Sequence, residues 1–541
     1  MLPQTFVGRE EVLTLLSKRV EALKSGYRQN VALTGQKLCG KTSILQYFLA
    51  TLRDSAVIPV YIEVLNESLD TFSKKFIGTM LFNYFKSQNE DVREDLYFLI
   101  GKAQWSIPKT TSAIKEVMAL LEKGDYQEAY SSLFNLASVL RQESLKSCVI
   151  ILDEFHNLSF FNLKNPFAIF GKRIMVQKDT MYVVTSSQVS SIKKILKEKL
   201  DLLFGNFEVI EIRDFDYSVS RRFLEKRLEG VALQGDFGDY LTAFTDGRPF
   251  YLDIIASKLL DIAAQHDTKE VNGFHIAVAL EELLFDSKGT LNQYFQNLIS
   301  PFTQTAYAND YVAILSAVAE GKRTLGGIRS AFTGKKNDLT ARAAKLTEEN
   351  FIAKNGSIYY LNDRVFEFWL KHVLNRKRHS LLSSFQDRSD SFRKEVEGLI
   401  VAFLSENKKK DHERIRELLA SFSGEVVVIG EKSIKFPPIA AIEIEDPDTS
   451  PGGFSLRALY ETRKFWFIRF SQSPVDESVM ASYMARLEEM SPAPQRTILV
   501  AFGGIDQNAM LIAKENKIVV WGRGDINLLM SLFRKLKFLC P

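Results

Sequence analysis

The sequence predicts an α/β protein whose first domain is built on a parallel sheet, and three segments carry that prediction. A short apolar run, residues 28–34, leads into a glycine-rich loop and then into residues 42–49, whose apolar positions have helical spacing. Two further apolar runs, residues 147–152 and 181–187, end in polar side chains. Buried parallel strands have this apolar character, and α/β sheets place their ligands at the carboxyl ends of the strands.

The glycine-rich loop matches the phosphate-binding pattern G-x-x-x-x-G-K-[ST]. Its residues are Gly35, Gln36, Lys37, Leu38, Cys39, Gly40, Lys41 and Thr42, with Ser43 next in the helix. Glycines let the backbone fold closely around phosphates, and amide N–H groups at a helix start attract anions. Lys41 is expected to reach the β- and γ-phosphates, and Thr42 to ligate Mg²⁺. A strand, this loop and a helix in that order predict a P-loop NTPase core.

The polar residues that end the other two strands predict the rest of a hydrolytic site. Asp153 is expected to hold Mg²⁺, and Glu154 to polarise the water that attacks the γ-phosphate. Ser187, after the third strand, is a candidate to hydrogen-bond the γ-phosphate or that water; the alternative is a serine turn cap. We also predict a strand at residues 207–212 and a mostly helical insertion at residues 67–146.

The bulk composition sets limits on class and compartment. A chain of 541 residues is too long for one core, and its net charge of +4 does not force a nucleic-acid partner. Three widely spaced cysteines, Cys39, Cys148 and Cys540, predict unpaired thiols in a reducing cytoplasm. No apolar run has the length needed to cross a bilayer, and the N-terminus lacks a signal-peptide pattern, so we expect no membrane partner.

Two further segments resemble archaeal-type STAND ATPases, which are relatives of the AAA+ enzymes. Residues 6–11, Phe-Val-Gly-Arg-Glu-Glu, are similar to the family's opening box, and residues 245–252 are similar to its G-x-P motif. The resemblance covers residues 1 to about 370 and implies ATP as the nucleotide. It also implies that Phe6 and Val7 lie beside the adenine and that Pro249 belongs to a helical lid packed against the base.

One position departs from the family pattern. Relatives often carry an arginine just ahead of the last strand of the sheet, whereas this chain has Asn206 there. An arginine at the γ-phosphoryl group accelerates hydrolysis about 10³–10⁵-fold in the best cases, so we expect slow turnover. Arg213, Arg248 or a residue from a neighbouring subunit could substitute.

The chain after the sheet predicts a helical lid and then a winged helix. Helices are expected at residues 311–319, 324–332 and 337–349, with a wing at residues 351–361. In DNA-binding versions the third helix enters the major groove. Basic and acidic residues are mixed around it: Lys335, Lys336, Arg342 and Lys345, against Asp338, Glu348 and Glu349. Contact with double-stranded DNA and a protein-packing or autoinhibitory role therefore both stay open.

The last third is similar to the restriction-endonuclease-like domain that is fused to many of these ATPases. Active versions need a helix glutamate, a strand aspartate and an E-x-K pair; Glu395 or Glu397 fits the first, and Glu443, Glu445 or Asp446 the second. Residues 469–471, Arg-Phe-Ser, stand where E-x-K is expected, which argues against nuclease activity. The alternative is an unrelated α/β domain.

These assignments divide the chain into an ATPase core at residues 1–217, a lid at 218–302, a winged helix at 303–374, a linker at 375–391 and the last domain at 392–541. The leading hypothesis is an ATP-driven switch with slow hydrolysis that gates a protein or DNA interaction of the C-terminal half. The alternative is a DNA-binding regulator or defence protein that keeps ATP mainly as a bound ligand. Homo-oligomerisation is a further candidate property.

Overall fold

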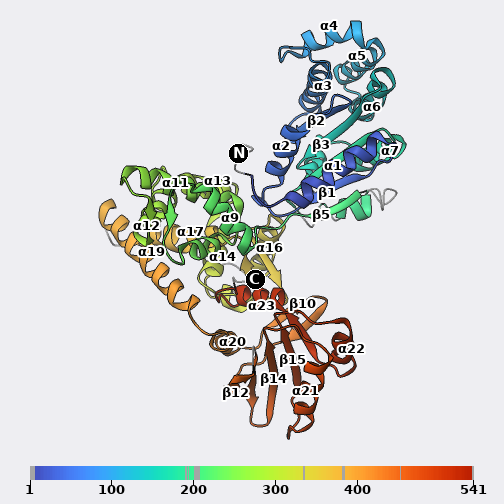
Figure 1. The fold of residues 1–541 in the computed structure, drawn as a ribbon. Coiled ribbons are helices and arrows are strands. Elements are labelled where there is room, and N and C mark those ends of the chain that lie inside the picture. Colours follow the sequence, from blue (N-terminus) through green and yellow to red (C-terminus); the bar gives the residue numbers. More distant parts are fainter. Residues whose placement is uncertain are drawn as a thin grey trace. The chain divides into compact units, whose positions relative to one another are not determined.

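The computed structural model describes residues 6–188, 192, 194–199, 207–332, 336–379, 384–450 and 453–538. These residues divide into two compact units (Figure 1). The first unit comprises residues 1–227 with 248–250, and the second comprises residues 228–247 with 251–541. Asn206, Lys335 and Cys540 lie outside the described residues, so the expectations for them stay predictions, as do the domain boundaries.

A five-stranded parallel sheet forms the centre of the first unit, which confirms the predicted fold class. Its strands are β1 (Asn30–Thr34), β2 (Val57–Glu63), β3 (Ser147–Asp153), β4 (Thr180–Ser186) and β5 (Phe207–Glu211). They lie in the order β2-β3-β4-β1-β5, which places β1 between β4 and β5. No strand was predicted at β2, although residues 58–63 alternate between buried and more exposed positions.

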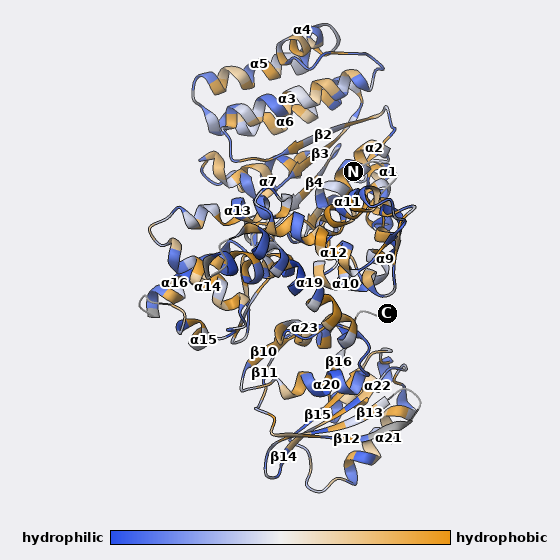
Figure 2. Ribbon diagram, turned by 90° about the vertical axis from the view of Figure 1, so that its left-hand side faces the viewer, coloured by the Kyte–Doolittle hydropathy of each residue, from blue (hydrophilic) through white to orange (hydrophobic). Residues whose placement is uncertain are grey.

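Helices cover both faces of this sheet. The helices of the first unit are α1 (Glu10–Lys24), α2 (Lys41–Thr51), α3 (Leu69–Lys86), α4 (Leu96–Ser106), α5 (Pro108–Glu122), α6 (Tyr126–Ser144), η2 (Phe155–Phe161), α7 (Pro166–Val176), η3 (Ile195–Lys199) and α9 (Tyr217–Arg227). Successive residues of β1 face opposite sides: Val31 and Leu33 pack with α1 and α2, whereas Ala32 joins the core of the insertion helices. Helices α3 to α6 form the predicted helical insertion, and Figure 2 shows them stacked beyond β2.

The second unit begins with helices in the region predicted as a lid. They are α10 (Phe237–Thr245), α11 (Pro249–Gln265), α12 (Gly273–Leu280), η5 (Glu281–Phe285) and α13 (Thr290–Thr303), with the short strands β6 (Ala232–Leu233) and β7 (Glu270–Val271). The first two residues of α11 belong to the first unit.

Three helices and an antiparallel hairpin follow, in the order predicted for residues 311–361. They are α14 (Ala308–Ala319), α15 (Leu325–Arg329), α16 (Lys336–Glu348), β8 (Ile352–Asn355) and β9 (Ile358–Leu361), and α17 (Arg364–Trp369), η6 (Leu370–Leu374) and α18 (Asn375–His379) continue the chain. The assignment of this segment as a winged helix stays a prediction.

The C-terminal part contains a mixed sheet. Its elements are α19 (Phe385–Asn407), α20 (Asp411–Ala420), β10 (Val426–Ile429), β11 (Lys432–Lys435), β12 (Ala441–Ser450), β13 (Gly453–Glu461), β14 (Lys464–Ser471), α21 (Glu477–Glu488), β15 (Arg496–Ala501), α22 (Gln507–Glu515), β16 (Val519–Gly522) and α23 (Arg523–Leu532). Strands β12, β13 and β14 are antiparallel, and β15 and β16 continue the sheet in parallel. The sequence analysis missed β11 and β13, and α19 begins inside the segment predicted as a linker.

Across the part of the chain that the structure describes, no helix has both the length and the apolar character that a membrane span requires.

We predict that Phe134 supports the insertion core. Its ring is fully buried and meets Tyr130 and Phe170 edge-on, each with a centroid distance of 5.1 Å. Phe134→Ala should lower the free energy of unfolding by about 3–5 kcal/mol, because it removes these contacts and leaves a cavity. Guanidinium denaturation followed by circular dichroism measures this change. Tyr126→Ala, at a half-exposed ring, is the control, and equal losses in both variants would contradict the assignment.

Candidate nucleotide site

The glycine-rich loop joins β1 to α2 and turns through two residues in the left-handed region. Leu38 has φ 70° and Gly40 has φ 94°, and Gly40 is the residue that precedes the first turn of α2. Gly35 cannot be replaced without movement, because a Cβ there would lie 2.2 Å from the carbonyl oxygen of Ile212. The loop therefore ends at the N-terminus of α2. Close packing requires glycine at position 35, and the positive φ favours it at position 40.

The Lys41 side chain is buried and crosses its own loop. Its Nζ donates hydrogen bonds to the carbonyl oxygens of Gly35 at 2.9 Å and Gln36 at 2.8 Å, and it lies 3.9 Å from Cys39 Sγ. Burial raises the pKa of the Cys39 thiol, and this outweighs the opposing effect of Lys41. Cys39 is thus a packed, protonated thiol at neutral pH, not a reactive thiolate.

The Asp153 carboxylate ends β3 and is 2% exposed. Its Oδ2 accepts hydrogen bonds from Thr42 Oγ1 at 2.7 Å and from Tyr61 OH at 2.9 Å. Its Oδ1 accepts from Thr185 Oγ1 and from the Glu154 amide. The carboxylate therefore connects α2, which follows the loop, with β2 and β4 on either side of its own strand.

Glu154 leaves β3 with a left-handed backbone, φ 55° and ψ 45°. Its Oε2 accepts hydrogen bonds from the Ser187 amide at 2.9 Å and from Ser187 Oγ at 3.0 Å. His156 Nδ1 lies 3.3 Å from the same oxygen and 3.0 Å from Ser186 Oγ. A left-handed glutamate costs of order 1–3 kcal/mol, so the surrounding contacts must hold it in place.

Residues 248–250 bring the start of α11 to the loop. Arg248 is 5% exposed, donates to Gln36 Oε1 at 2.9 Å and lies 3.5 Å from Asp214 Oδ2. Pro249 is the nearest neighbour of a Cβ placed on Gly40, at 3.9 Å. Pro249 thus lies near Gly40 of the phosphate-binding loop, and its expected packing against the base stays a prediction.

The opening box also approaches this region. The Phe6 ring stacks on Tyr47 of α2 with centroids 4.2 Å apart, and Val7 beside it is half-buried. Gly8 has φ 63°, and a Cβ there would meet Val219 at 2.3 Å. Arg9 donates to the Cys39 carbonyl oxygen at 3.3 Å, which ties the box directly to the loop.

The sequence analysis missed three side chains of this cluster. Tyr61 lies on β2, a strand that was not predicted, and its register beside Ile151 is visible only once the strands are paired. His156 falls in η2, directly after the acidic pair, and Arg9 falls inside the opening box. The signals in the sequence that could have identified these residues are their polar side chains and their closeness to the motifs. Of the predicted loop residues, Gln36, Lys37 and Thr42 are exposed, and Ser43 is half-buried.

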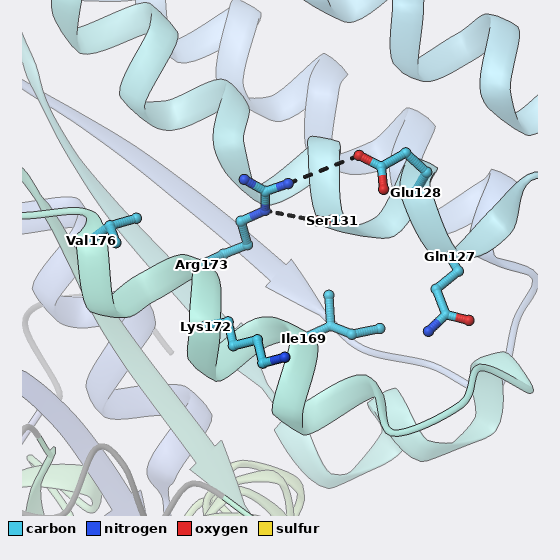
Figure 3. Close-up of a pocket in the computed structure, with 7 residues that line it drawn as sticks. All are labelled: Gln127, Glu128, Ser131, Ile169, Lys172, Arg173 and Val176. Atoms are coloured by element: carbon cyan, nitrogen blue, oxygen red, sulfur yellow. Dashed lines mark hydrogen bonds and ion pairs between the residues drawn. The ribbon is translucent and has the colours of Figure 1, made fainter.

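A separate groove of about 400 Å³ lies between α6 and α7 (Figure 3). Arg173 crosses it, with Nε donating to Ser131 Oγ at 2.7 Å and Nη2 3.9 Å from Glu128. The groove is also lined by Gln127, Ile169, Lys172 and Val176. None of these residues belongs to the loop or to the polar strand ends, so the groove is distinct from the candidate nucleotide site.

Comparison with known proteins supports the assignment of the first unit. Residues 6–255 match the model of an ATPase domain found predominantly in Archaea. A protein of Methanocaldococcus jannaschii described as uncharacterized is 25% identical over 333 residues, which cover 58% of this chain and 67% of that protein. This chain is therefore similar to an archaeal-type ATPase domain over residues 6–255.

Solved structures with partial similarity include ATPases of archaea and bacteria. A Walker-type ATPase of Pyrococcus abyssi is 17% identical with a TM-score of 0.48, and the match covers 68% of this chain and 96% of that chain. The Aeropyrum pernix ORC1 protein, solved in complex with DNA, is 15% identical with a TM-score of 0.40, over 68% of this chain and 92% of that chain. The RuvB Holliday-junction branch-migration motor of Thermotoga maritima is 13% identical with a TM-score of 0.34, over 68% and 96%.

We predict that His156 makes stability depend on pH. Burial, with a smaller effect from Lys41, lowers the pKa of His156 below its ordinary value of 6.5, although Glu154 opposes the shift. The unfolded chain thus binds a proton more readily, so stability is lost as pH falls below about 6.5 and levels off below the folded-state pKa. As pH falls from 7.5 to 5.5, the free energy of unfolding of His156→Gln should therefore rise relative to that of the parent, as measured by guanidinium denaturation. Parallel pH profiles for the two proteins would contradict this.

Proposed function

We propose that this chain binds ATP with Mg²⁺ at the glycine-rich loop and hydrolyses it slowly, as a switch whose nucleotide state controls an interaction of the C-terminal half. The observation that carries the proposal is the 2.7 Å hydrogen bond between Thr42 Oγ1 and Asp153 Oδ2. These residues lie 111 positions apart in the sequence. Their hydroxyl and carboxylate oxygens lie side by side, and a magnesium-nucleotide site needs such oxygen ligands.

The residues present fit a magnesium ion. Thr42 offers a hydroxyl and Asp153 a carboxylate, which are hard oxygen ligands, and Tyr61 and Thr185 fix the carboxylate orientation. Within the ranges that the structure describes, no group of three His, Cys, Asp or Glu side chains could form a metal cage by itself. This suits Mg²⁺, which keeps waters and shares its coordination with phosphate oxygens. When bound, the ion would neutralise charge on the β- and γ-phosphates.

The chain's own groups supply the other roles that we propose. Lys41 and the amides at the start of α2 would hold the phosphates, and Phe6, Val7 and Pro249 would border the base. Glu154 would accept the proton of the attacking water, with the hydrogen bonds from Ser187 fixing its carboxylate. Ser187 would thereby link the γ-phosphate position to the catalytic base.

The arrangement of Arg248 supports slow turnover. Its guanidinium lies beside Asp214 and Gln36, so part of its charge is engaged within the chain. An arginine already paired with an acid stabilises developing phosphate charge less than one aimed solely at the transition state. We therefore propose that Arg248 responds to movement of the loop through its hydrogen bond to Gln36. It would accelerate hydrolysis only modestly.

The second candidate function is a DNA-binding regulator that keeps ATP mainly as a ligand. Its recognition element would be α16 of the proposed winged helix, where basic side chains are engaged by neighbours. Arg342 lies 2.6 Å from Asp310 and its guanidinium covers the Tyr307 ring at 3.9 Å, while Lys345 pairs with Glu349 at 2.8 Å. These pairs reduce the attraction for a phosphate backbone, so we favour a protein partner for this helix.

We propose that the C-terminal domain is no longer a nuclease. Glu395, one of the two candidate helix glutamates with Glu397, pairs with His372 at 3.0 Å and Arg376 at 2.9 Å. Arg469 donates to Ser455 Oγ at 3.1 Å, and Ser471 donates to the Ser473 carbonyl oxygen at 2.9 Å. These contacts are those of packed structural residues. A reducing, cytoplasmic setting fits the buried free thiols of Cys39 and Cys148.

The proposal predicts different outcomes for two substitutions in the site. Lys41→Ala should abolish ATP binding in calorimetry, because it removes the cation that holds the phosphates. Glu154→Gln should retain binding and slow phosphate release about 10²–10⁴-fold, because it removes the base without removing a phosphate ligand. Lys178→Ala, at an exposed residue just before β4 and outside the loop, is the control. Undetectable phosphate release from the parent protein would instead favour the regulator with bound ATP.

Magnesium dependence should pass through Asp153. Saturating ATP with Mg²⁺ should stabilise the folded protein by about 2.7 kcal/mol at a ligand concentration 100 times Kd. EDTA should remove much of this stabilisation by ATP and Mg²⁺ from the parent protein. It should change the stability of Asp153→Asn only a little. Thermal unfolding with and without the chelator measures both effects. An identical response to EDTA in the two proteins would exclude Asp153 as the metal-linked residue.

A further inference from the structure

Helix α4 of the insertion presents a largely exposed aromatic face, on which the Arg93 guanidinium lies over the Phe98 ring at 4.3 Å. One side of the helix buries Leu99, Ile100 and Ala103 in the insertion core. The other side exposes Tyr97 at 68%, Phe98 at 36% and Trp105 at 90%. Figure 2 shows α4 at the outer edge of the insertion, beyond α3 and α5. The three other tryptophans, Trp369, Trp466 and Trp521, are all buried.

This exposed face is symmetric about Gly101. Tyr97 and Trp105 lie four residues before and after it, and Phe98 and Gln104 lie three residues before and after it. These spacings put all five positions on one face of a helix. A Cβ built on Gly101 meets nothing within 4 Å, so packing inside the chain does not require glycine there. Glycine inside a helix is destabilising relative to alanine, and the fold offers no compensation.

The two ends of the face carry opposite charge. Residues 90–95 hold four carboxylates and one arginine, but Asp91 pairs with Lys86 at 2.9 Å and Glu90 with Lys102 at 2.5 Å, so Glu94, Asp95 and Arg93 leave a net charge of −1. Residues 107–115 hold two lysines and no acid, a net charge of +2. Lys115 lies beside the face itself, because its Nζ donates to Gln104 Oε1 at 2.6 Å. An antiparallel copy of the same segment would therefore bring each acidic end against a basic end.

We propose that α4 is the contact between two copies of this chain, packed antiparallel across a two-fold axis at Gly101. Tyr97 of one copy would then face Trp105 of the other, and Phe98 would face Gln104. The bare backbone at Gly101 lets the two helices approach closely at the crossing point. Such an interface is self-complementary, as a two-fold dimer requires.

The dimer is a weak one by its size. Helix α4 has 11 residues, a length of about 16 Å, so its face is smaller than the roughly 800 Å² per partner of a standard stable interface. Association should therefore depend on concentration over the micromolar range. It does not involve the nucleotide site and goes beyond the proposed function.

Sedimentation velocity and tryptophan fluorescence on the full chain test the proposal together. Raising the protein concentration to about 100 µM should shift the protein from monomer to dimer. Over the same range the exposed tryptophan component, which comes from Trp105, should shift to the blue and lose its quenching by iodide. The buried tryptophans should not change, so the optical signal reports this one contact.

Two substitutions separate an interface role from a structural one. Trp105→Ala should weaken the dimer about tenfold, because the most exposed aromatic side chain of the face is lost. Gly101→Leu should also block the dimer, while its thermal stability as a monomer stays equal or rises, since the added side chain enters open space. Tyr126→Ala, at an exposed ring outside this face, should leave association unchanged.

Three outcomes would overturn the proposal. The first is a monomer at every concentration with unchanged fluorescence. The second is a dimer that is equally strong in Gly101→Leu, which would place the contact elsewhere. The third is protection of Trp105 only when an unrelated protein is added, which would make the face a site for a different partner.

Discussion

The arrangement of the first unit around the loop depends on the hydrogen bonds that one buried carboxylate, that of Asp153, accepts. Asp153 is almost fully removed from water, and a charge in that position is costly unless hydrogen bonds replace its hydration. Donors come from the loop helix, from β2, from β4 and from the adjacent amide. Each of these contacts also fixes an element, so the same four bonds that stabilise the charge hold the loop at the carboxyl edge of the sheet.

The neighbouring carboxylate, Glu154, has a different environment, which suits the different role that we propose for it. Asp153 is locked by its donors, whereas Glu154 bends away in a left-handed conformation toward Ser187 and His156. A group that serves as a base has to reach water, while a group that positions an ion has to stay still. The change of backbone conformation between consecutive residues permits both roles at the end of a single strand.

The sequence predicted the parts of this site that carry local patterns. A glycine loop between a strand and a helix, and carboxylates after an apolar run, are encoded within a few residues, so Lys41, Thr42 and Asp153 could be named in advance. Tyr61 could not, because its role arises from the pairing of β2 with β3 and not from its neighbours in sequence. Strand β11 was not predicted because it has four residues and a single apolar one, Ile434. Strand β13 was not predicted although apolar and polar residues alternate over residues 454–458.

The path of the chain through the site suggests how nucleotide could act beyond it. Residues 248–250 pack with the loop, yet the residues on both sides of them in sequence belong to the second unit. Pro249 begins α11, and a helix transmits a displacement of its first turn along its length because its hydrogen bonds keep it rigid. A ligand that moved Gln36 or Gly40 would therefore act on Arg248 and Pro249, and through them on α11.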